Sequence, residues 1–250
     1  MFNTPTPAPY SLRVLAALLR YPDAAFRAAV PEMQQALKRE AALPAARIDE
    51  LCALLQRLQQ ADAFAVEADF VDLFDRGRGT ALHLFEHIHG DSRDRGPAMV
   101  DLQQTYERAG LYLAPGELPD HLAVVLEFAS TQPAREARSF LGETAHIARA
   151  IFSALQRRQS PYASVLAAVL ELAGERAEPV DIAPEPGLDE AWAEPEAFGG
   201  CSSAGQSRPE QPQPIHIVRK QSAHQPGAQA LTPCITSCSS STPTSAWLSS

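Results

Sequence analysis

Apolar residues recur every three or four positions along most of residues 10–176, a spacing that places them on one face of an α-helix. Alternating apolar and polar positions, and the Asn-Gly or Asp-Gly pairs that favour hairpins, are missing from the same stretch. We therefore predict an all-α domain with roughly nine helical segments. The clearest stripes are Leu12, Leu15, Leu18 and Leu19; Ile48, Leu51, Leu55 and Leu58; and Phe64, Phe70, Val71 and Phe74.

Capping residues and prolines mark where these helices begin. Ser and Asp satisfy free amides at an N-cap, and proline is tolerated in a first turn because its missing N–H would have no partner there. Glycine is typical of the position just after a helix end, here Gly110. The predicted starts are Ser11 and Asp23 as N-caps, Pro31 opening a separate segment, Gly96-Pro97, and Pro119 in the first turn of a helix over residues 118–128.

The composition changes near residue 177. Residues 177–250 contain ten of the 21 prolines, many Ser, Gln and Thr, and few aromatic residues. Such a segment buries too little apolar surface to offset the conformational entropy that is lost on ordering. We predict a single compact helical domain over residues 1–176, followed by an acidic, Pro- and Ser-rich disordered tail over residues 177–250.

The net charge of −9 excludes one class of partner. Neutralising phosphates requires a surplus of Lys and Arg, whereas this chain carries 21 basic against 30 acidic residues, so we expect no nucleic acid as a partner. The N-terminus lacks the basic and apolar regions of a secretory signal, and no apolar run approaches the roughly 20 residues of a bilayer span. We therefore expect a cytoplasmic protein without membrane insertion, and its oligomeric state stays open.

Residues 73–102 are the most informative part of the chain, because three histidines and four arginines stand there among regularly spaced apolar residues. Charge this dense in an amphipathic pattern is typical of a binding surface or a site. One alternative is a zinc hydrolase, since His83, Glu86 and His87 match the H-x-x-E-H spacing. A third ligand such as Glu143 or Glu171 would be needed, and those enzymes use large α/β domains. We therefore expect no metal and no catalysis.

Two blocks of sequence resemble a known family. LFDRGRGTALHLFEHIHGDSRDRGPAMVDL (73–102) and ELPDHLAVVLEF (117–128) are similar to the NarJ-type assembly chaperones of respiratory nitrate reductase. The Pro119-Asp120-His121 step before an apolar run and Glu127 is similar to the wider TorD/DMSO-reductase chaperone superfamily. The first block is long and ungapped, and the resemblance extends over about residues 10–176.

The resemblance implies a helical domain of the TorD-like type that acts as a cytoplasmic chaperone and not as an enzyme. Its partner would be the catalytic, molybdenum-binding subunit of nitrate reductase, bound mainly through its N-terminal peptide and in its cofactor-free form. The chaperone would keep that subunit competent for molybdenum cofactor insertion before membrane docking, and would need no cofactor itself. Alternatives are a chaperone of another molybdoenzyme of the superfamily, the zinc hydrolase, and a generic helical adaptor.

A peptide-binding groove needs an apolar surface and polar groups at its rim. We expect the apolar part to come from Phe70, Phe74, Leu84, Leu122 and Phe128, although residues at this spacing also suit a plain core. Hydrogen-bonding groups are expected from Asp75, Glu86, Asp120, Glu127, His87 and His121. The charged loop residues form either part of the site or an internal salt-bridge lattice; these are Asp75, Arg76, Arg78, Arg93, Asp94 and Arg95.

Overall fold

The computed structural model describes residues 6–90 and 92–181, and within these ranges the chain forms nine α-helices and one short 3₁₀ helix. The predicted tail lies outside the described residues except for residues 177–181. The helices are α1 (Pro9–Leu18), α2 (Ala24–Glu40), α3 (Ala45–Gln60), α4 (Ala63–Phe74), η1 (Arg78–Thr80), α5 (Leu84–His89), α6 (Arg95–Arg108), α7 (Leu122–Thr131), α8 (Ala134–Arg157) and α9 (Ala163–Ala173).

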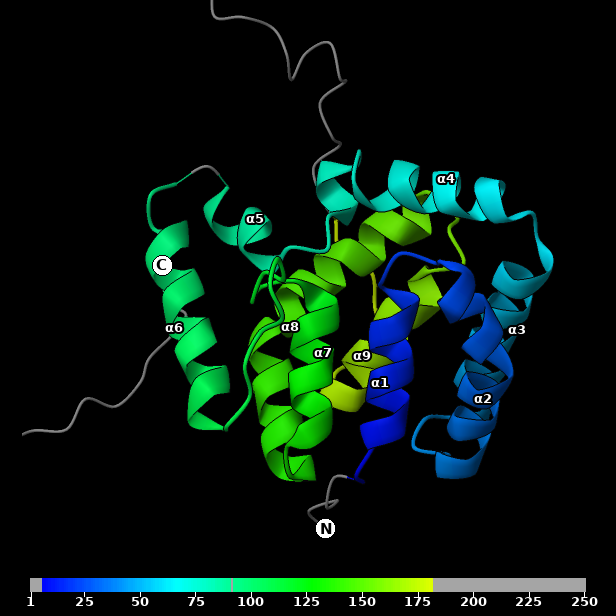
Figure 1. Cartoon of the computed structure of the whole chain (residues 1–250), viewed down its shortest axis with the longest axis horizontal. Helices are drawn as coiled ribbons and strands as arrows, with labels where there is room; N and C mark the ends of the chain where they lie inside the picture. Colours follow the sequence, from blue (N-terminus) through cyan, green and yellow to red (C-terminus); the bar gives the residue numbers. More distant parts are fainter. Residues whose placement is uncertain (1–5, 91, 182–250) are drawn as a thin grey trace, which may run out of the picture. The chain divides into compact units, whose positions relative to one another are not determined.

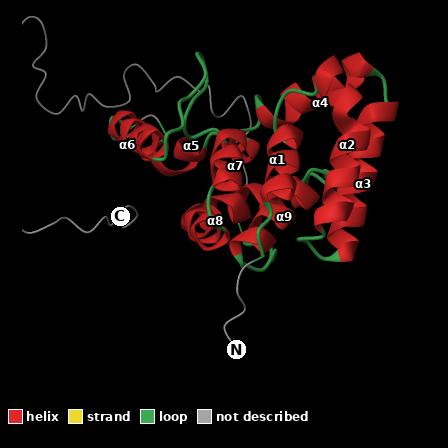
Figure 2. Cartoon of the chain, turned by 60° about the horizontal axis from the view of Figure 1, so that its bottom comes forward, coloured by secondary structure: helices red, strands yellow, loops and turns green. Residues whose placement is uncertain are grey.

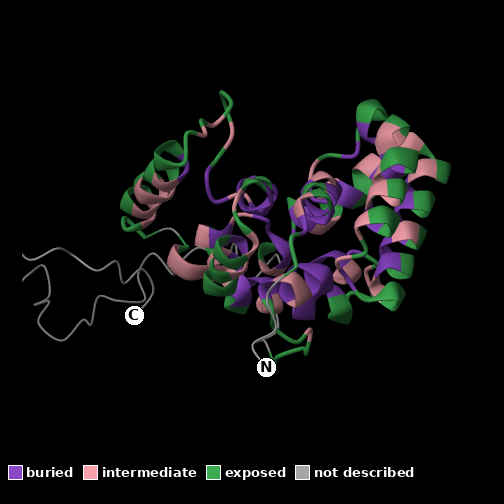
Figure 3. Cartoon of the chain, turned by 90° about the horizontal axis from the view of Figure 1, so that it is seen from below, coloured by how far each residue is buried: buried purple, intermediate pink, exposed green. Residues whose placement is uncertain are grey.

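Four helices form the centre of the domain. Helix α1 packs against α7, and α8 packs against both α7 and α9 (Figure 1). Helices α2 and α3 lie on one side of this centre, and α5 and α6 lie on the other (Figure 1). Buried residues concentrate on the central helices, whereas α6 shows mostly exposed and half-buried positions (Figure 3). The central stripes therefore bury apolar area against one another, which is the main stabilising contribution.

The prediction of an all-α domain is confirmed, since Figure 2 shows only helices and loops in the described ranges. Ile48, Leu51, Leu55 and Leu58 are buried on α3, as their spacing predicts. Phe64 is an exception, because it starts α4 with 82% of its surface exposed. None of the helices in the described ranges is both long and apolar enough to cross a membrane.

Asp23 caps α2 as predicted, with its side chain accepting a hydrogen bond from Phe26 N at 2.8 Å. The prediction for Ser11 is wrong, because α1 already begins at Pro9 and Ser11 is buried in its first turn. The amides of Tyr10 and Ser11 donate instead to the carboxylate of Glu40, at 3.0 and 2.6 Å. The cap of α1 thus comes from the end of α2, which no local pattern could show.

Pro31 does not open a separate segment, and that prediction is also wrong. Helix α2 continues through it from Ala24 to Glu40. A proline inside a helix leaves the carbonyl four residues earlier without its usual donor. Here that carbonyl belongs to Arg27, and it accepts a hydrogen bond from the side-chain amide of Gln59 on α3 at 3.3 Å. A long-range contact therefore replaces the missing hydrogen bond.

The helix predicted over residues 118–128 begins at Leu122, and Pro119 precedes it. Residues 120–122 instead run beside residues 82–84. Leu84 N donates to Asp120 O at 3.0 Å, and Leu122 N donates to Leu82 O at 2.8 Å. His83 and His121 face each other in this short antiparallel bridge. The bridge fixes the starts of α5 and α7 side by side.

Candidate functional site

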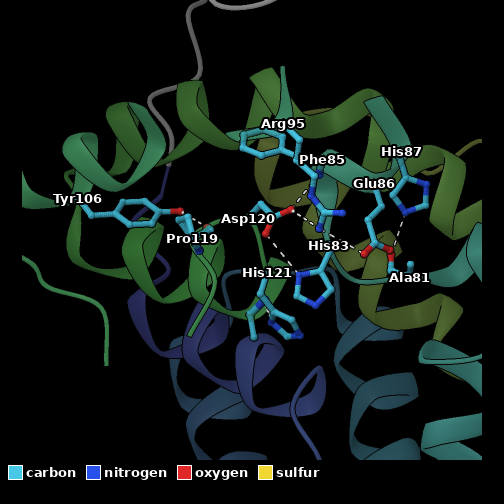
Figure 4. Close-up of polar contacts among 11 residues, drawn as sticks. Ala81, His83, Phe85, Glu86, His87, Arg95, Tyr106, Pro119, Asp120 and His121 are labelled. Atoms are coloured by element: carbon cyan, nitrogen blue, oxygen red, sulfur yellow. Dashed lines mark hydrogen bonds and ion pairs between the residues drawn. The ribbon is translucent and has the colours of Figure 1, made fainter. Parts of the chain in front are cut away.

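Asp120 is the centre of a polar network at the starts of α5 and α7 (Figure 4). Its side chain is completely buried, yet three groups surround its carboxylate. Oδ2 accepts a hydrogen bond from Phe85 N at 3.2 Å and lies 3.8 Å from Arg95 Nη2, and Oδ1 lies 3.4 Å from His83 Nδ1. A buried carboxylate needs such partners because its desolvation is costly. Asp120 therefore caps α5 and anchors the start of α6.

Besides Leu102, which packs against the cluster of Tyr106, Val124 and Phe128, two polar side chains attach helix α6 to the domain, one at each end. Arg95 at its start donates from Nη2 to Glu86 Oε1 at 3.3 Å, in addition to its contact with Asp120. Tyr106 near its end is buried, and its hydroxyl donates to Pro119 O at 2.9 Å. Burial, with the charge of Asp120 second, raises the pKa of Tyr106. Both attachments end on the Pro119-Asp120 step that the family resemblance singled out.

The ring centres of His83 and His121 lie 5.0 Å apart, but the pKa values of the two residues are shifted in opposite directions. The hydrogen bond to Asp120 raises the pKa of His83 above its ordinary value of 6.5. Burial, followed by the nearby charges of His83 and Arg20, lowers the pKa of His121 to about 4. Nδ1 of His121 accepts a hydrogen bond from Ala123 N at 3.3 Å and so caps α7. At neutral pH, His121 is therefore a neutral acceptor.

The zinc alternative requires His83 and His87 on one face of the same helix, and the structure does not place them so. His83 precedes α5 as its N-cap, so it does not share a helix face with His87. Nε2 of His87 instead lies 2.9 Å from Ala81 O, and His83 is turned towards Asp120 (Figure 4). Glu171, one of the two suggested third ligands, pairs with Arg47. Among the described residues, no group of three or more potential ligands could hold a metal ion.

The five apolar residues predicted for the groove are all buried. Phe70 and Phe74 contact each other and Tyr162, with ring centres 4.8 to 6.1 Å apart. Leu84 and Leu122 lie in the same main core. Phe128 alone belongs to a separate small cluster with Tyr106 and Val124. In this conformation, four of the five predicted groove residues are core residues.

The charged loop residues do not form one lattice within the described ranges. Arg76 pairs with Asp72 at 3.2 Å, and both side chains are largely exposed. The side chains of Asp94 and Ser92 are hydrogen-bonded at 3.3 Å, and only Arg95 reaches Asp120. Three further members of the predicted set are exposed, namely Asp75, Arg78 and Arg93. Most of this charge is therefore open to a partner.

The loop between α4 and α5 is packed more tightly than its two glycines suggest. Thr80 is completely buried, and its hydroxyl donates to the carbonyls of Leu73 and Gly77. A Cβ atom added at Gly77 would lie 2.4 Å from Thr80 Oγ1 and 2.8 Å from Arg158 Nη2. Gly77 is therefore required by close packing, and the loop holds Arg76 and Arg78 at the surface.

An open groove of about 510 Å³ lies between α1, α7 and the segment that joins α6 to α7. We call it the α1–α7 groove. Its buried apolar lining is the small cluster of Tyr106, Val124 and Phe128, and the buried Ser130 lies beside it. Glu127 and Phe128 are the two residues of the predicted site that line it. The remaining lining includes Arg13, Arg20, Leu111, Tyr112, Leu113 and Glu117.

Most of the residues that line this groove were not predicted from the sequence. One signal was available, because Leu111, Tyr112 and Leu113 form an apolar run between Gly110 and Pro115, outside any helix. An apolar run in a loop is unusual unless it packs or binds, and Tyr112 is 81% exposed. The part played by Arg13 and Arg20 could not be read from the sequence, since α1 and α7 are about a hundred residues apart.

Comparisons with known protein sequences show which family the chain belongs to. The family model for the nitrate reductase delta subunit matches residues 20–168. The chain therefore belongs to this family. It is 43% identical over 162 residues to "Nitrate reductase molybdenum cofactor assembly chaperone NarJ" of Escherichia coli strain K12, covering 65% of this chain and 69% of that protein.

Two further relatives have related names. The protein named "Probable nitrate reductase molybdenum cofactor assembly chaperone NarW" of the same strain is 37% identical over 163 residues, or 65% of this chain and 68% of that protein. "Probable nitrate reductase molybdenum cofactor assembly chaperone NarJ" of Bacillus subtilis strain 168 is 32% identical over 168 residues, or 65% and 89%. The family resemblance drawn from residues 73–102 and 117–128 is thus confirmed.

Proposed function

We propose that this chain is a cytoplasmic chaperone that binds the N-terminal segment and the cofactor-free form of the catalytic subunit of nitrate reductase. Binding keeps the subunit competent for insertion of its molybdenum cofactor and holds it back from membrane docking until insertion is complete. The names of the relatives support the chaperone role, and they agree with the expectation that the chain is not an enzyme. The cofactor is cargo for the client, so the chaperone does not need a site for it.

The α1–α7 groove is the observation that carries this proposal. A peptide can lay an apolar face against the buried cluster of Tyr106, Val124 and Phe128, with polar contacts at the rim. Tyr112 stands at this groove with most of its ring exposed, and large aromatic residues are frequent anchors of binding energy. The net charge of −9 favours a basic partner.

The other predicted site residues fit two supporting roles in this proposal. The network around Asp120 positions the elements beside the groove; it contains the buried Leu84, Asp120 and Leu122, the half-buried His87, Arg95 and His121, and the exposed Glu86. The exposed charges offer a second contact surface for the folded part of the client; they are Asp75, Arg76, Arg78, Arg93 and Asp94. Phe70 and Phe74 contribute through the core that supports α4.

Calorimetric titration tests the proposal directly. The purified chain is titrated with a synthetic peptide from the N-terminus of the nitrate reductase catalytic subunit of the same organism, with a scrambled peptide as control. We expect saturable one-to-one binding that the scrambled peptide does not show. Equal binding of both peptides would instead indicate a generic adaptor. Stronger binding of the corresponding peptide from another molybdoenzyme would assign a different client.

Two exposed aromatic residues provide a matched pair of variants. Tyr112 lines the groove and is 81% exposed, whereas Phe64 on α4 is 82% exposed and does not line it. Tyr112→Ser should weaken peptide binding by about five- to tenfold, the loss expected for an aromatic anchor. Phe64→Ser should leave the affinity unchanged. Equal effects of the two substitutions would show that the groove does not contact the peptide.

A further inference from the structure

The end of the α1–α7 groove that contains Arg20 holds two carboxylates and one cation. Arg20 Nη1 lies 2.6 Å from Glu117 Oε1, and Arg20 Nε lies 3.1 Å from Glu127 Oε1. All three side chains line the groove, and all three are partly exposed. The cluster therefore carries one negative charge in excess at a place that a docked segment would touch.

Arg13 provides an internal comparison for Arg20. It lies on α1, seven residues before Arg20, which follows the end of the helix, and it lines the same groove. Its Nε donates to Ser130 Oγ at 3.3 Å, but among the described residues it has no carboxylate partner. The two arginines thus differ in their ion pairs. Arg20 pairs with two carboxylates, whereas Arg13 pairs with none among the described residues. The sign of the charge in the groove changes from one end to the other.

We propose that Glu117 and Glu127 bind a basic side chain of the client, and that Arg20 competes with that side chain for the two carboxylates. This inference rests on the proposed function, since the basic side chain belongs to the N-terminal segment of the client that is proposed to bind in the groove. When the segment is absent, Arg20 neutralises one of the two charges. When it docks, its cation meets carboxylates that are already held at the groove, beside the apolar cluster of Tyr106, Val124 and Phe128.

Competition is the expected behaviour for a pair at this degree of exposure. Ion pairs between partly exposed side chains contribute little net stability, so water and other cations exchange with them readily. The side chain of Glu127 is 50% exposed and that of Arg20 is 37% exposed. A client cation arrives together with apolar contacts that exclude water, and the same charges attract more strongly when water is excluded. Docking therefore favours ion pairs between the two carboxylates and the client over their ion pairs with Arg20.

Removing Arg20 should tighten binding, which distinguishes competition from ordinary contact. The affinity of the peptide is measured by calorimetry for the full chain and for Arg20→Ala, Arg13→Ala, Glu127→Gln and the double variant Arg20→Ala/Glu127→Gln. Arg20→Ala should bind about three- to tenfold more tightly, because both carboxylates are free. Arg13→Ala removes the same charge from the same groove without freeing a carboxylate, so its affinity should not rise. Circular dichroism and thermal melting verify that each variant is folded.

Glu127→Gln should weaken binding, and the gain from Arg20→Ala should shrink in the double variant. A peptide whose Lys and Arg residues are replaced by Gln should show no gain with Arg20→Ala. If Arg20→Ala binds more weakly than the unchanged chain, Arg20 itself contacts the client and the inference is wrong. An equal increase in affinity with Arg13→Ala would show that the effect depends only on the overall charge of the groove. That result would also overturn the inference.

The failure of this inference and the failure of the proposed function give different results. If the unchanged chain does not bind the peptide, the proposed function fails and the inference fails with it. If the unchanged chain binds the peptide and Arg20→Ala does not tighten binding, only the inference fails. The client would then still be recognised, but its cations would be bound elsewhere.

Discussion

Asp120 accepts a hydrogen bond from the backbone amide of Phe85 at 3.2 Å, so a residue just before α7 caps α5 from 35 positions away. The sequence predicted that Asp120 is important but placed it at the rim of a groove. The structure buries it completely and gives it a positioning role. The position of the Pro119-Asp120-His121 step directly before α7 therefore suits the way α5, α6 and α7 meet.

Replacing Asp120 should strongly destabilise the domain. Asp120→Ala should lower the free energy of unfolding by about 2 to 4 kcal/mol, because Phe85 N and the partners of a buried charge lose their acceptor. Asp120→Asn keeps an acceptor and should cost about 1 to 2 kcal/mol. Urea denaturation measures both. Asp94, whose side chain does not cap α6, is the control, and Asp94→Ala should cost less than about 0.5 kcal/mol.

Protonation of His121 should make stability depend on pH. Its folded pKa of about 4 lies below the ordinary value of 6.5, so between these values the unfolded chain binds a proton that the folded chain does not. Stability from this residue is present above pH 6.5 and is lost as the pH falls towards 4. Protonated Nδ1 also cannot accept the hydrogen bond from Ala123 N. The melting temperature should therefore fall between pH 7 and pH 5.

The variant His121→Asn isolates this effect, because asparagine is a good N-cap and does not titrate in this range. Its melting temperature should fall less than that of the unchanged chain over the same interval. His83 has a raised pKa, so its contribution is present at low pH and is lost as the pH rises through its folded pKa. If the melting temperature of His121→Asn depends on pH as steeply as that of the unchanged chain, His121 is not the residue responsible.

Glu40 should contribute measurably to the stability of α1. Its carboxylate accepts from Tyr10 N and Ser11 N, which have no partners within α1. Glu40→Ala should lower the free energy of unfolding by about 1 to 2 kcal/mol, as for the loss of a helix cap. Glu32 is exposed on the same helix, and Glu32→Ala should change it by less than about 0.5 kcal/mol. Chemical denaturation of the two variants should separate these values.

Gly77 should not tolerate a methyl group. Its φ of −97° is open to any residue, so the obstacle is the crowding by Thr80 and Arg158. Gly77→Ala should destabilise the domain by about 1 to 3 kcal/mol, the usual cost of overpacking. Gly142 lies in α8 with no atom near its added Cβ, so Gly142→Ala should instead stabilise by up to about 1 kcal/mol. Similar melting temperatures for both variants would refute the packing argument.

Local patterns predicted those parts of the fold that depend on neighbouring residues. The stripe that includes Ile48 and Leu55, and the cap at Asp23, follow from spacing and side-chain chemistry alone, and all are confirmed. The starts predicted at Ser11 and Pro31 failed because Glu40 and Gln59, which lie elsewhere in the chain, satisfy the backbone groups concerned. Tertiary contacts override local propensity at such positions.

The same limit applies to the site. Residues 73–102 supply Glu86 and Arg95 to the network around Asp120, but spacing could not separate Leu84 and Leu122 in the core from Phe128 at the groove. The groove combines α1, α7 and the connecting segment, so its lining becomes apparent only when these are brought together. Arg20 and Glu117 were missed for this reason, because their ion pair joins positions that are 97 residues apart.

The separation of Tyr106, Val124 and Phe128 from the main core has a consequence for how the domain opens. Helix α6 has one fully packed side chain, whereas eight residues of α7 are buried. Cooperative units with few buried contacts open at lower free energy than the core does. We therefore expect α6 to detach and re-form more readily than α1, α7, α8 and α9 unfold. Tyr106, which α6 contributes to the groove, would move with the helix, so the groove is an adjustable part of the molecule whose width can change without unfolding the domain.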